Sequence, residues 1–405
     1  MNKIFGGVCL IAGTAIGSGM LALPIILASF GIFYSVLLII SIWLLTYYTS
    51  LVSIELNLQA GQGFSLGKLG KLYSGKGAEL IGVLSIKIIS YALLSVFIYG
   101  ISSVIQKMIM EFYGYSFSFE LIALFSAVSA MLILSLSMHL IDHINRILFY
   151  CLLISIATII FGLLIVIDWN NAPINVTSCT FKDLRLAIPV MFTSFGYQTI
   201  FASLVQYFDN DAIKLKKACF WGSLIPTVVY ALWFIVILTV IHNHDIDFYT
   251  AMANGSVDVS NMILKLSEIA NITYMKILVW YLSILAIFTS LIGLGIGLTS
   301  AWEDILSKGS SEVNFSVKIQ ALLLSFIPSL LIAVIVPNAF VKMLSFAGMI
   351  LVIIAVLLPL YLLQKAQINK LYYYILTSKL IRCIAVLFGL CIITMEVLNI
   401  FFKGI

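Results

Sequence analysis

Charge is scarce in this sequence of 405 residues. Asp, Glu, Lys and Arg together make up 10% of it, whereas a soluble chain carries about 25%. Hydrophobic residues account for 62%, and the mean hydropathy is +1.15. An ordinary soluble domain is therefore excluded. No cluster of Lys and Arg with interleaved aromatic residues is found, so the net charge of +5 does not indicate a nucleic-acid partner.

Metal-binding and redox motifs are also lacking. The six cysteines show no CxxC spacing. All of them except Cys179 fall in apolar runs, where a thiol behaves as a small hydrophobic group. No HExxH motif is present, and no histidine lies deep in an apolar run. We therefore expect no disulfide framework, no metal site, no cofactor and no enzymatic activity.

What the sequence does contain is a series of apolar runs of roughly 20 residues, the length that a helix needs to cross a bilayer. The runs lack period-2 alternation, so they predict helices and not a β-barrel. A single transmembrane domain over residues 1–405 follows, with the first run retained and not cleaved as a signal peptide. The eleven predicted spans are 4–30, 32–57, 78–108, 119–138, 147–167, 185–208, 218–241, 274–300, 318–336, 340–363 and 381–401.

The positions of Lys and Arg predict the orientation, because these residues are enriched in cytoplasmic loops. With the N-terminus inside, fourteen of the 22 fall on the inner side, seven fall on the outer side, and Lys87 lies within a span. The sequence therefore predicts a cytoplasmic N-terminus and, after eleven spans, a C-terminus outside. Glu55 and Glu396 lie near span ends, and we expect both at the membrane interface.

Spans one and six each contain a small, polar stretch about ten residues from their start, at residues 13–20 and 192–198. Glycine costs a helix about 1 kcal/mol relative to alanine, and proline costs about 3 kcal/mol. These stretches therefore predict that both helices are interrupted near mid-membrane. An alternative stays open for span one, because Gly13 and Gly17 form a GxxxG pattern that also permits close packing of unbroken helices.

The two interruptions are five spans apart, so the helices that carry them run in opposite directions. Paired interruptions of this kind are typical of inverted repeats with a binding site at their interface. The sequence thus predicts one five-helix repeat over residues 1–167, a second, inverted one over 185–363, and an additional helix at 381–401.

The interruptions are also the predicted substrate site. An opened helix presents free N–H and C=O groups with partial positive and negative charge. Neither stretch contains Asp, Glu, Lys or Arg, which favours a zwitterion over a net ion. Aromatic faces within the second stretch would suit an aromatic substrate. The predicted substrate-binding residues are Thr14, Ala15, Ile16, Gly17, Ser18, Gly19, Met20, Phe192, Thr193, Ser194, Phe195, Gly196, Tyr197 and Gln198.

In four stretches, residues 13–24, 189–207, 214–226 and 287–304, the chain resembles the hydroxy/aromatic amino acid permeases of the amino acid-polyamine-cation superfamily. The resemblance is to the tyrosine- and tryptophan-specific branch and extends over nearly the whole chain. It implies a LeuT-type fold with discontinuous helices one and six, and ion-coupled import of aromatic amino acids across a bacterial inner membrane. The chain departs from the family pattern at Gln198, where a histidine is expected, and at Lys87.

The coupling-ion candidates follow partly from the same resemblance. In sodium-coupled relatives, two hydroxyls like those of Thr289 and Ser290 bind the cation together with carbonyls of span one, here those of Gly13 and Ile16. The alternative is that both hydroxyls donate back to their own helix. Lys87 is either a proton carrier or a cation that reaches the inner interface.

Tyr91 lies one turn after Lys87 on the same helix face. Because the resemblance makes span three part of the substrate pocket, Tyr91 is a further candidate substrate contact. A core aromatic residue is the alternative interpretation.

Together these features predict a symporter that imports tyrosine, or next tryptophan, by alternating access. Spans 1, 2, 6 and 7 would rock against spans 3, 4, 8 and 9. The expected partners are the amino acid, a coupling cation (H⁺, with Na⁺ as the alternative) and the lipid bilayer. A Na⁺-coupled symporter or an exchanger of another small neutral amino acid remains open. A channel is disfavoured, because no span carries a continuous polar stripe.

Overall fold

The computed structural model describes residues 3–17, 19–136, 138–175, 179–269, 273–306, 314–336, 339–366, 368 and 370–401. In these residues the fold is entirely helical, without strands. Lipid cannot bond to backbone groups, so a chain this apolar satisfies them within helices. The long helices are α3 (Gly31–Gln59), α5 (Lys76–Tyr113), α7 (Met138–Leu164), α10 (Ala212–His244), α13 (Thr273–Leu306), α14 (Phe315–Ile335) and α17 (Lys379–Phe401).

Shorter elements complete the chain, several of them at the positions where predicted spans are broken. They are α1 (Lys3–Ala15), α2 (Gly19–Leu27), η1 (Ala28–Phe30), α4 (Leu66–Ser74), α6 (Phe119–Ser135), η2 (Trp169–Asn171), α8 (Phe181–Ser194), η3 (Tyr197–Ile200), α9 (Phe201–Tyr207), α11 (Ile246–Ala253), α12 (Val259–Ile269), α15 (Ala339–Val352), η4 (Ile353–Leu357), α16 (Leu358–Lys365) and η5 (Tyr374–Thr377).

Eight helical runs in the described part of the chain are long and apolar enough to cross a membrane. The prediction of a polytopic helical membrane protein is thereby confirmed. The helices at the other predicted spans do not reach that length: α6 has 17 residues, and spans one and six are each divided into pieces. The number of eleven crossings therefore stays a prediction.

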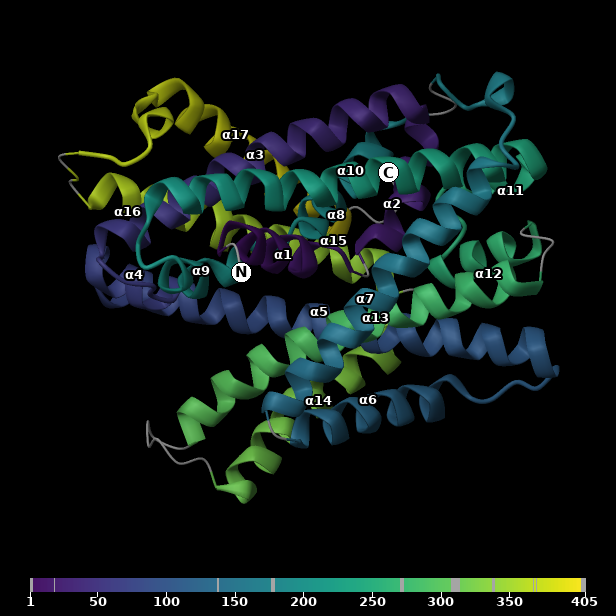
Figure 1. The fold of residues 1–405 in the computed structure, drawn as a ribbon, viewed down its shortest axis with the longest axis horizontal. Helices are drawn as coiled ribbons and strands as arrows, with labels where there is room; N and C mark the ends of the chain where they lie inside the picture. The colour runs from purple at the N-terminus through teal and green to yellow at the C-terminus, as the bar shows by residue number, and fades with distance from the viewer. Residues whose placement is uncertain are drawn as a thin grey trace.

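The helices pack in two groups, which Figure 1 shows one below the other. In one group, α5, α6, α13 and α14 all contact each other. In the other, α10 packs against α1, α2 and α3, and α8 packs against α2 and α3. The helix α15 lies between the groups, against both α5 and α8, and α17 covers α8 and α15 from outside.

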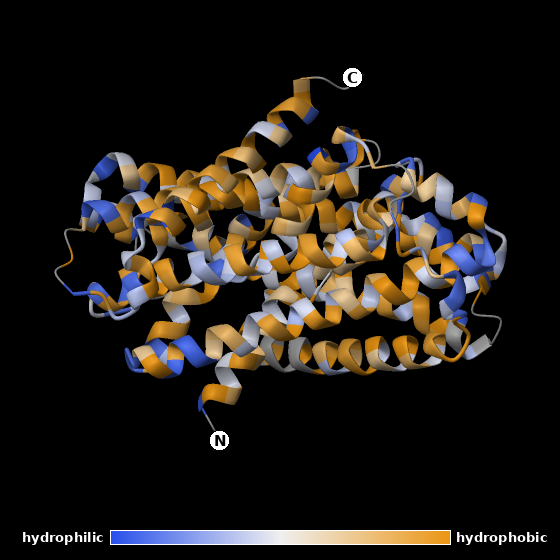
Figure 2. Cartoon of the chain, turned by 90° about the horizontal axis from the view of Figure 1, so that it is seen from above, coloured by the Kyte–Doolittle hydropathy of each residue, from blue (hydrophilic) through white to orange (hydrophobic). Residues whose placement is uncertain are grey.

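Polar residues gather at the two ends of the molecule and leave an apolar band between them (Figure 2). In Figure 1, α11 and α12 lie at one end, and α4, α9 and α16 lie at the other. The long helices α5, α10 and α13 have 38, 33 and 34 residues, more than the roughly 20 that a bilayer requires, so their ends extend beyond the apolar band.

The buried carboxylate of Glu55 stabilises the end of the fold that carries α4 and α16. Glu55, in the last turns of α3, is fully buried. It accepts hydrogen bonds from Gln59 Nε2 at 2.7 Å and from the backbone N–H groups of Tyr372 and Tyr373 at 3.1 and 3.2 Å. The chain after α16 folds back over Glu55 and supplies two of these three donors, while Gln59 of the same helix supplies the third. Protein therefore covers the carboxylate, and its depth at the membrane interface stays a prediction.

An ion pair holds the opposite end. Asp245 accepts from the N–H of Phe248 at 2.8 Å, as the cap of α11, and from Lys265 Nζ of α12 at 2.6 Å. The hydrogen bond from Lys265, followed by that of Phe248, lowers the pKa of Asp245 below 3.8, and the same pairing raises the pKa of Lys265 above 10.5. Both charges therefore stabilise the folded state between these two values.

The variant Asp245→Asn tests this cap. Because the carboxylate has a lowered pKa in the folded state, its contribution is present above about pH 4 and is lost as the pH falls through the folded value. We expect the variant to lose about 0.5–1 kcal/mol near neutral pH. The thermal unfolding midpoint in detergent should then differ between the two proteins at neutral pH, and the difference should shrink in acid. A constant difference at every pH would contradict the assignment.

Candidate functional site

The first helix of the fold is interrupted at the residues that the sequence singled out. The helix α1 ends at Ala15, α2 begins at Gly19, and Ile16 and Gly17 bend between them. The N–H of Ile16 still donates to Ala12 O at 2.8 Å, and that of Met20 donates to Gly17 O at 3.2 Å. Ser18, a predicted site residue, lies outside the described residues.

The sixth predicted span is also interrupted. The helix α8 contains Pro189 and ends at Ser194, after which Phe195 and Gly196 leave helical geometry and the 3-10 helix η3 begins at Tyr197. The chain turns through short local bonds, from Phe195 N to Phe192 O at 3.2 Å and from Tyr197 N to Phe195 O at 2.8 Å.

One side chain joins the two interruptions. The hydroxyl of Tyr230, on α10, donates toward Ala15 O at 2.5 Å and toward Ser194 O at 2.8 Å. These carbonyls are the last of α1 and the last of α8. A hydroxyl has one hydrogen, so it cannot satisfy both acceptors at once, and acceptor capacity remains at the junction. Sequence reasoning missed Tyr230, which is one of 19 tyrosines and lies in an apolar run without a distinguishing motif.

Glycine permits close approach at the first interruption. A Cβ on Gly17 would clash with Ser290 Oγ of α13, and a Cβ on Gly19 would lie 3.0 Å from Ser194 Cα of α8. Span one is therefore both interrupted and closely packed against its neighbours. The two interpretations of its glycines, a helix break and close helix packing, both apply. Gly13 is half-buried, and a Cβ there would lie 3.3 Å from the ring of Phe149.

The candidate hydroxyls donate back to their own helices. The acceptors are the carbonyls three or four residues earlier, at 2.7–3.2 Å: Leu10 for Thr14, Pro189 for Thr193, Val190 for Ser194, Leu285 and Ala286 for Thr289, and Ala286 for Ser290. Thr193 also donates to Leu344 O of α15 at 2.9 Å. Such back-bonding was the alternative interpretation of Thr289 and Ser290. It leaves oxygen lone pairs that a cation can still use.

The predicted aromatic residues are buried against neighbouring rings. Phe192 and Tyr197 are fully buried and Phe195 almost so. Phe195 makes an edge contact with the Tyr230 ring at 5.4 Å between centroids, and Tyr197 makes one with Phe201 at 6.0 Å. These rings form a buried aromatic wall along the second interruption, and Phe195 is the ring of this wall that contacts Tyr230.

Gln198 is the unusual polar residue of this wall. Its side chain is 7% exposed, and neither Nε2 nor Oε1 has a hydrogen-bond partner in the described part of the chain. An unsatisfied buried polar group costs about 1–3 kcal/mol. An amide left unpaired beside the break of span six marks a place where a polar group of a ligand would be stabilised.

Lys87 and Tyr91 lie in a different neighbourhood. The Tyr91 hydroxyl accepts from Trp302 Nε1 of α13 and donates to Leu324 O of α14, both at 2.8 Å. Lys87 Nζ lies 4.4 Å from the centroid of the Trp302 ring, in cation–π geometry. These contacts tie α5 to α13 and α14, and none of them involves a residue of the two breaks. Trp302 was not among the predicted site residues.

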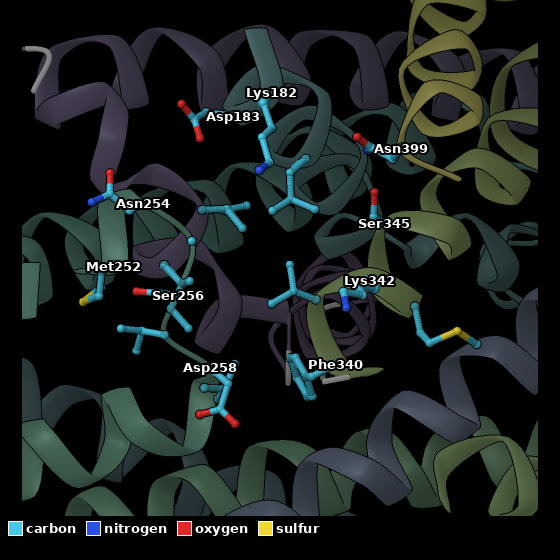
Figure 3. A pocket seen from close by; sticks show the side chains of 18 of the residues that line it. Lys182, Asp183, Met252, Asn254, Ser256, Asp258, Phe340, Lys342, Ser345 and Asn399 are labelled. Carbon is cyan, nitrogen blue, oxygen red and sulfur yellow. The ribbon is translucent and has the colours of Figure 1, made fainter. Parts of the chain in front are cut away.

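A pocket of about 870 Å³ opens at the end of the molecule that carries α11 and α12 (Figure 3). Its wall includes α2 and α8, the half-helices next to the two breaks, together with parts of α5, α15 and α17. No predicted site residue lies in this wall. The wall carries both signs of charge, from Lys182, Arg185, Lys342, Asp183, Asp258 and Glu396.

The known proteins that are similar to this chain are transport proteins, which agrees with its membrane fold. Tyrosine-specific transport system 1 of Haemophilus influenzae is 31% identical over 370 residues, which cover 91% of this chain and 89% of that protein. Glutamine transporter 2 of Aliivibrio fischeri is 28% identical over 98% of this chain and 99% of its own length. The low affinity tryptophan permease of Escherichia coli K12 is 26% identical over 99% and 96%, respectively.

The model of the tryptophan/tyrosine permease family matches residues 1–396, which include both interrupted helices, Tyr230 and all of α13 to α16. The predicted resemblance is thereby confirmed, and so is the prediction of a transport protein in place of an enzyme. The chain belongs to the tryptophan/tyrosine permease family of membrane transport proteins.

Proposed function

We propose that this protein is a cation-coupled symporter that imports an aromatic amino acid, tyrosine first and tryptophan next, by alternating access. The observation that carries the proposal is the junction at Tyr230, where the carbonyl ends of two interrupted helices face one hydroxyl. The family and the printed functions of the relatives from Haemophilus influenzae and Escherichia coli support the choice of substrate.

The amino acid would bind across the two breaks. Its ammonium has three hydrogens and suits the carbonyls of Ala15 and Ser194, which carry the partial negative charge of helix C-termini. Its carboxylate suits the positive N-terminal end of α2, which begins at Gly19. The unpaired amide of Gln198 lies in the same wall and is available to a polar group of the substrate.

The packing supports an inverted five-plus-five repeat of the LeuT type. When each span is exchanged with the span five later, α1 corresponds to α8 and α2 to α9. Contacts then map onto contacts: α1 with α10 onto α8 with α3, α2 with α10 onto α9 with α3, α5 with α6 onto α13 with α14, and α7 with α13 onto α15 with α5. The pairs α3 with α10, α5 with α13 and α6 with α14 map onto themselves. A two-fold axis in the membrane plane produces this correspondence.

We further propose eleven spans in a bacterial inner membrane, with a cytoplasmic N-terminus and the C-terminus outside. The pocket beside α11 and α12 then faces the outside. The two packed groups of helices correspond to the spans expected to rock against each other: α1, α2, α3, α8 and α10 against α5, α6, α13 and α14.

A second candidate substrate is a small neutral amino acid that is not aromatic. The similarity to Glutamine transporter 2 of Aliivibrio fischeri favours it, and so does the burial of the aromatic rings against each other. The coupling cation is H⁺ or Na⁺. The approach of Ser290 Oγ to Gly17 brings a hydroxyl of α13 to the first break, as a Na⁺ site there requires.

Uptake by purified protein in proteoliposomes tests the substrate and the ion together. Labelled tyrosine, tryptophan and glutamine are each offered under an inward H⁺ gradient, an inward Na⁺ gradient, or neither. We expect tyrosine to accumulate under the H⁺ gradient, with protein-free liposomes as the control. Accumulation of glutamine but not of the aromatic amino acids would establish the second candidate, and accumulation of none would refute the assignment.

The variant Tyr230→Phe tests the junction. Loss of the hydroxyl leaves the carbonyls of Ala15 and Ser194 without their shared donor, at a cost of about 0.5–1.5 kcal/mol. The Tyr230 hydroxyl positions the two protein carbonyls that would accept hydrogen bonds from the substrate ammonium. We therefore expect tyrosine uptake to fall by about two- to tenfold or more. The variant Tyr373→Phe is the matched control, since its hydroxyl donates to Ala212 O at 2.9 Å, away from both breaks. Equal uptake by both variants would contradict a role for the junction.

A further inference from the structure

A carboxylate lies inside the apolar part of α17 with no assigned role. Glu396 is 3% exposed, although its helix lies on the outside of the bundle against α8 and α15. The helices α8 and α15 cover the side chain, and the predicted depth of Glu396 at the membrane interface stays a prediction. Ionisable groups at such positions are costly to bury and mark ion or proton pathways.

The partners of Glu396 are neutral donors. Oε2 accepts hydrogen bonds from Ser345 Oγ of α15 and from Asn399 Nδ2 at 3.1 Å. The same Asn399 amide donates to Arg185 O of α8 at 2.9 Å. Glu396 is therefore the centre of a network that joins α17 to α15 and, through Asn399, to α8. Ser345 and Asn399 lie together on one side of the pocket in Figure 3.

Charged side chains of the neighbouring helices line the same pocket. From α8, Lys182, Asp183 and Arg185 face the pocket, and from α15 Lys342 does. The helix η4 contributes no titratable residue, and Tyr374 of η5 lies near the opposite end of α17. In the part of the chain that the structure describes, no Lys or Arg lies within ion-pair distance of the carboxylate. A proton from the pocket is therefore the charge that can neutralise it.

We propose that Glu396 is a proton-binding site and supplies the H⁺ coupling of the proposed symport, on which this inference rests. In the step, a proton from the pocket bonds to the carboxylate, one O–H bond forms, and the net charge of the site changes from −1 to zero. Hydrogen bonds to an ionised acceptor are about twice as strong as those to a neutral one. Protonation thus weakens the hydrogen bonds that Ser345 and Asn399 donate to the carboxyl group of Glu396.

Protonation of Glu396 changes how firmly α8 is attached to α17. Asn399 is the link between the carboxylate and the Arg185 carbonyl, and α8 runs from there to Ser194 at the second break. When the acceptor loses its charge, α8 and α15 are released from α17 at the pocket end. In this way a proton from the pocket side changes the mobility of the half-helix that forms the substrate site.

The binding of the proton is measurable without substrate. Infrared difference spectra of the full chain, recorded on a step from alkaline to acidic buffer, should show a protonated-carboxyl band that Glu396→Gln removes. The variant Glu55→Gln is the matched control, because Glu55 is equally buried at the other end of the fold, and it should keep the band. A spectrum unchanged by Glu396→Gln overturns the proposal.

Transport by the same variant tests the coupling. Glu396→Gln keeps the hydrogen-bonding shape but cannot exchange a proton, so accumulation of labelled tyrosine under an H⁺ gradient should be lost. Exchange of labelled for unlabelled tyrosine, with no gradient, should stay within about threefold of the unaltered protein. Loss of both activities in a folded variant, or accumulation that keeps its pH dependence, overturns the proposal. If the unaltered protein moves no amino acid but shows the Glu396 band, the proposed function fails while the proton site stands.

Discussion

Backbone groups at mid-membrane have to find a partner inside the protein, and this constraint governs the centre of the fold. Two helices end where no water is available to their last carbonyls. One hydroxyl, that of Tyr230, is shared between these two carbonyls, and glycines let the neighbouring helices approach to van der Waals contact. The remaining elements can be understood as support for this junction: α10 positions the tyrosine, and α13 and α8 close around Gly17 and Gly19.

Local composition was sufficient to predict the helical membrane fold and the places where helices one and six are interrupted. Hydropathy and backbone propensity act within a few residues, so both can be derived from a single sequence. Tyr230 could not be predicted, because its role depends on a contact between residues 215 and 36 positions apart in the chain. Tyr91 shows the opposite case: the helix was predicted correctly, but the side chain points to Trp302 and Leu324, not to a break.

The two buried carboxylates, Glu55 and Glu396, show the same limit of sequence reasoning. Each lies near the end of an apolar run, where an interfacial position is the ordinary expectation. Segments distant in sequence cover them, the residues after α16 in one case and the helices α8 and α15 in the other. Their partners nevertheless differ in kind: backbone amides fix Glu55 to one loop, whereas side chains on separate helices surround Glu396. The carboxylate of Glu55 thus forms a rigid attachment, whereas the carboxylate of Glu396 forms an adjustable one.

In the proposed five-plus-five repeat, the pair α8 and α15 corresponds to the pair α1 and α7, and the two pairs pack unequally. The helix α8 packs along α15, whereas the corresponding surfaces of α1 and α7 touch sparsely in the described part of the chain, for example where Gly13 approaches Phe149. An outward swing of α1 from α7 would expose little new apolar surface, while a separation of α8 from α15 would expose a long seam. In the proposed alternating access, separating α1 from α7 therefore costs less buried surface than separating α8 from α15.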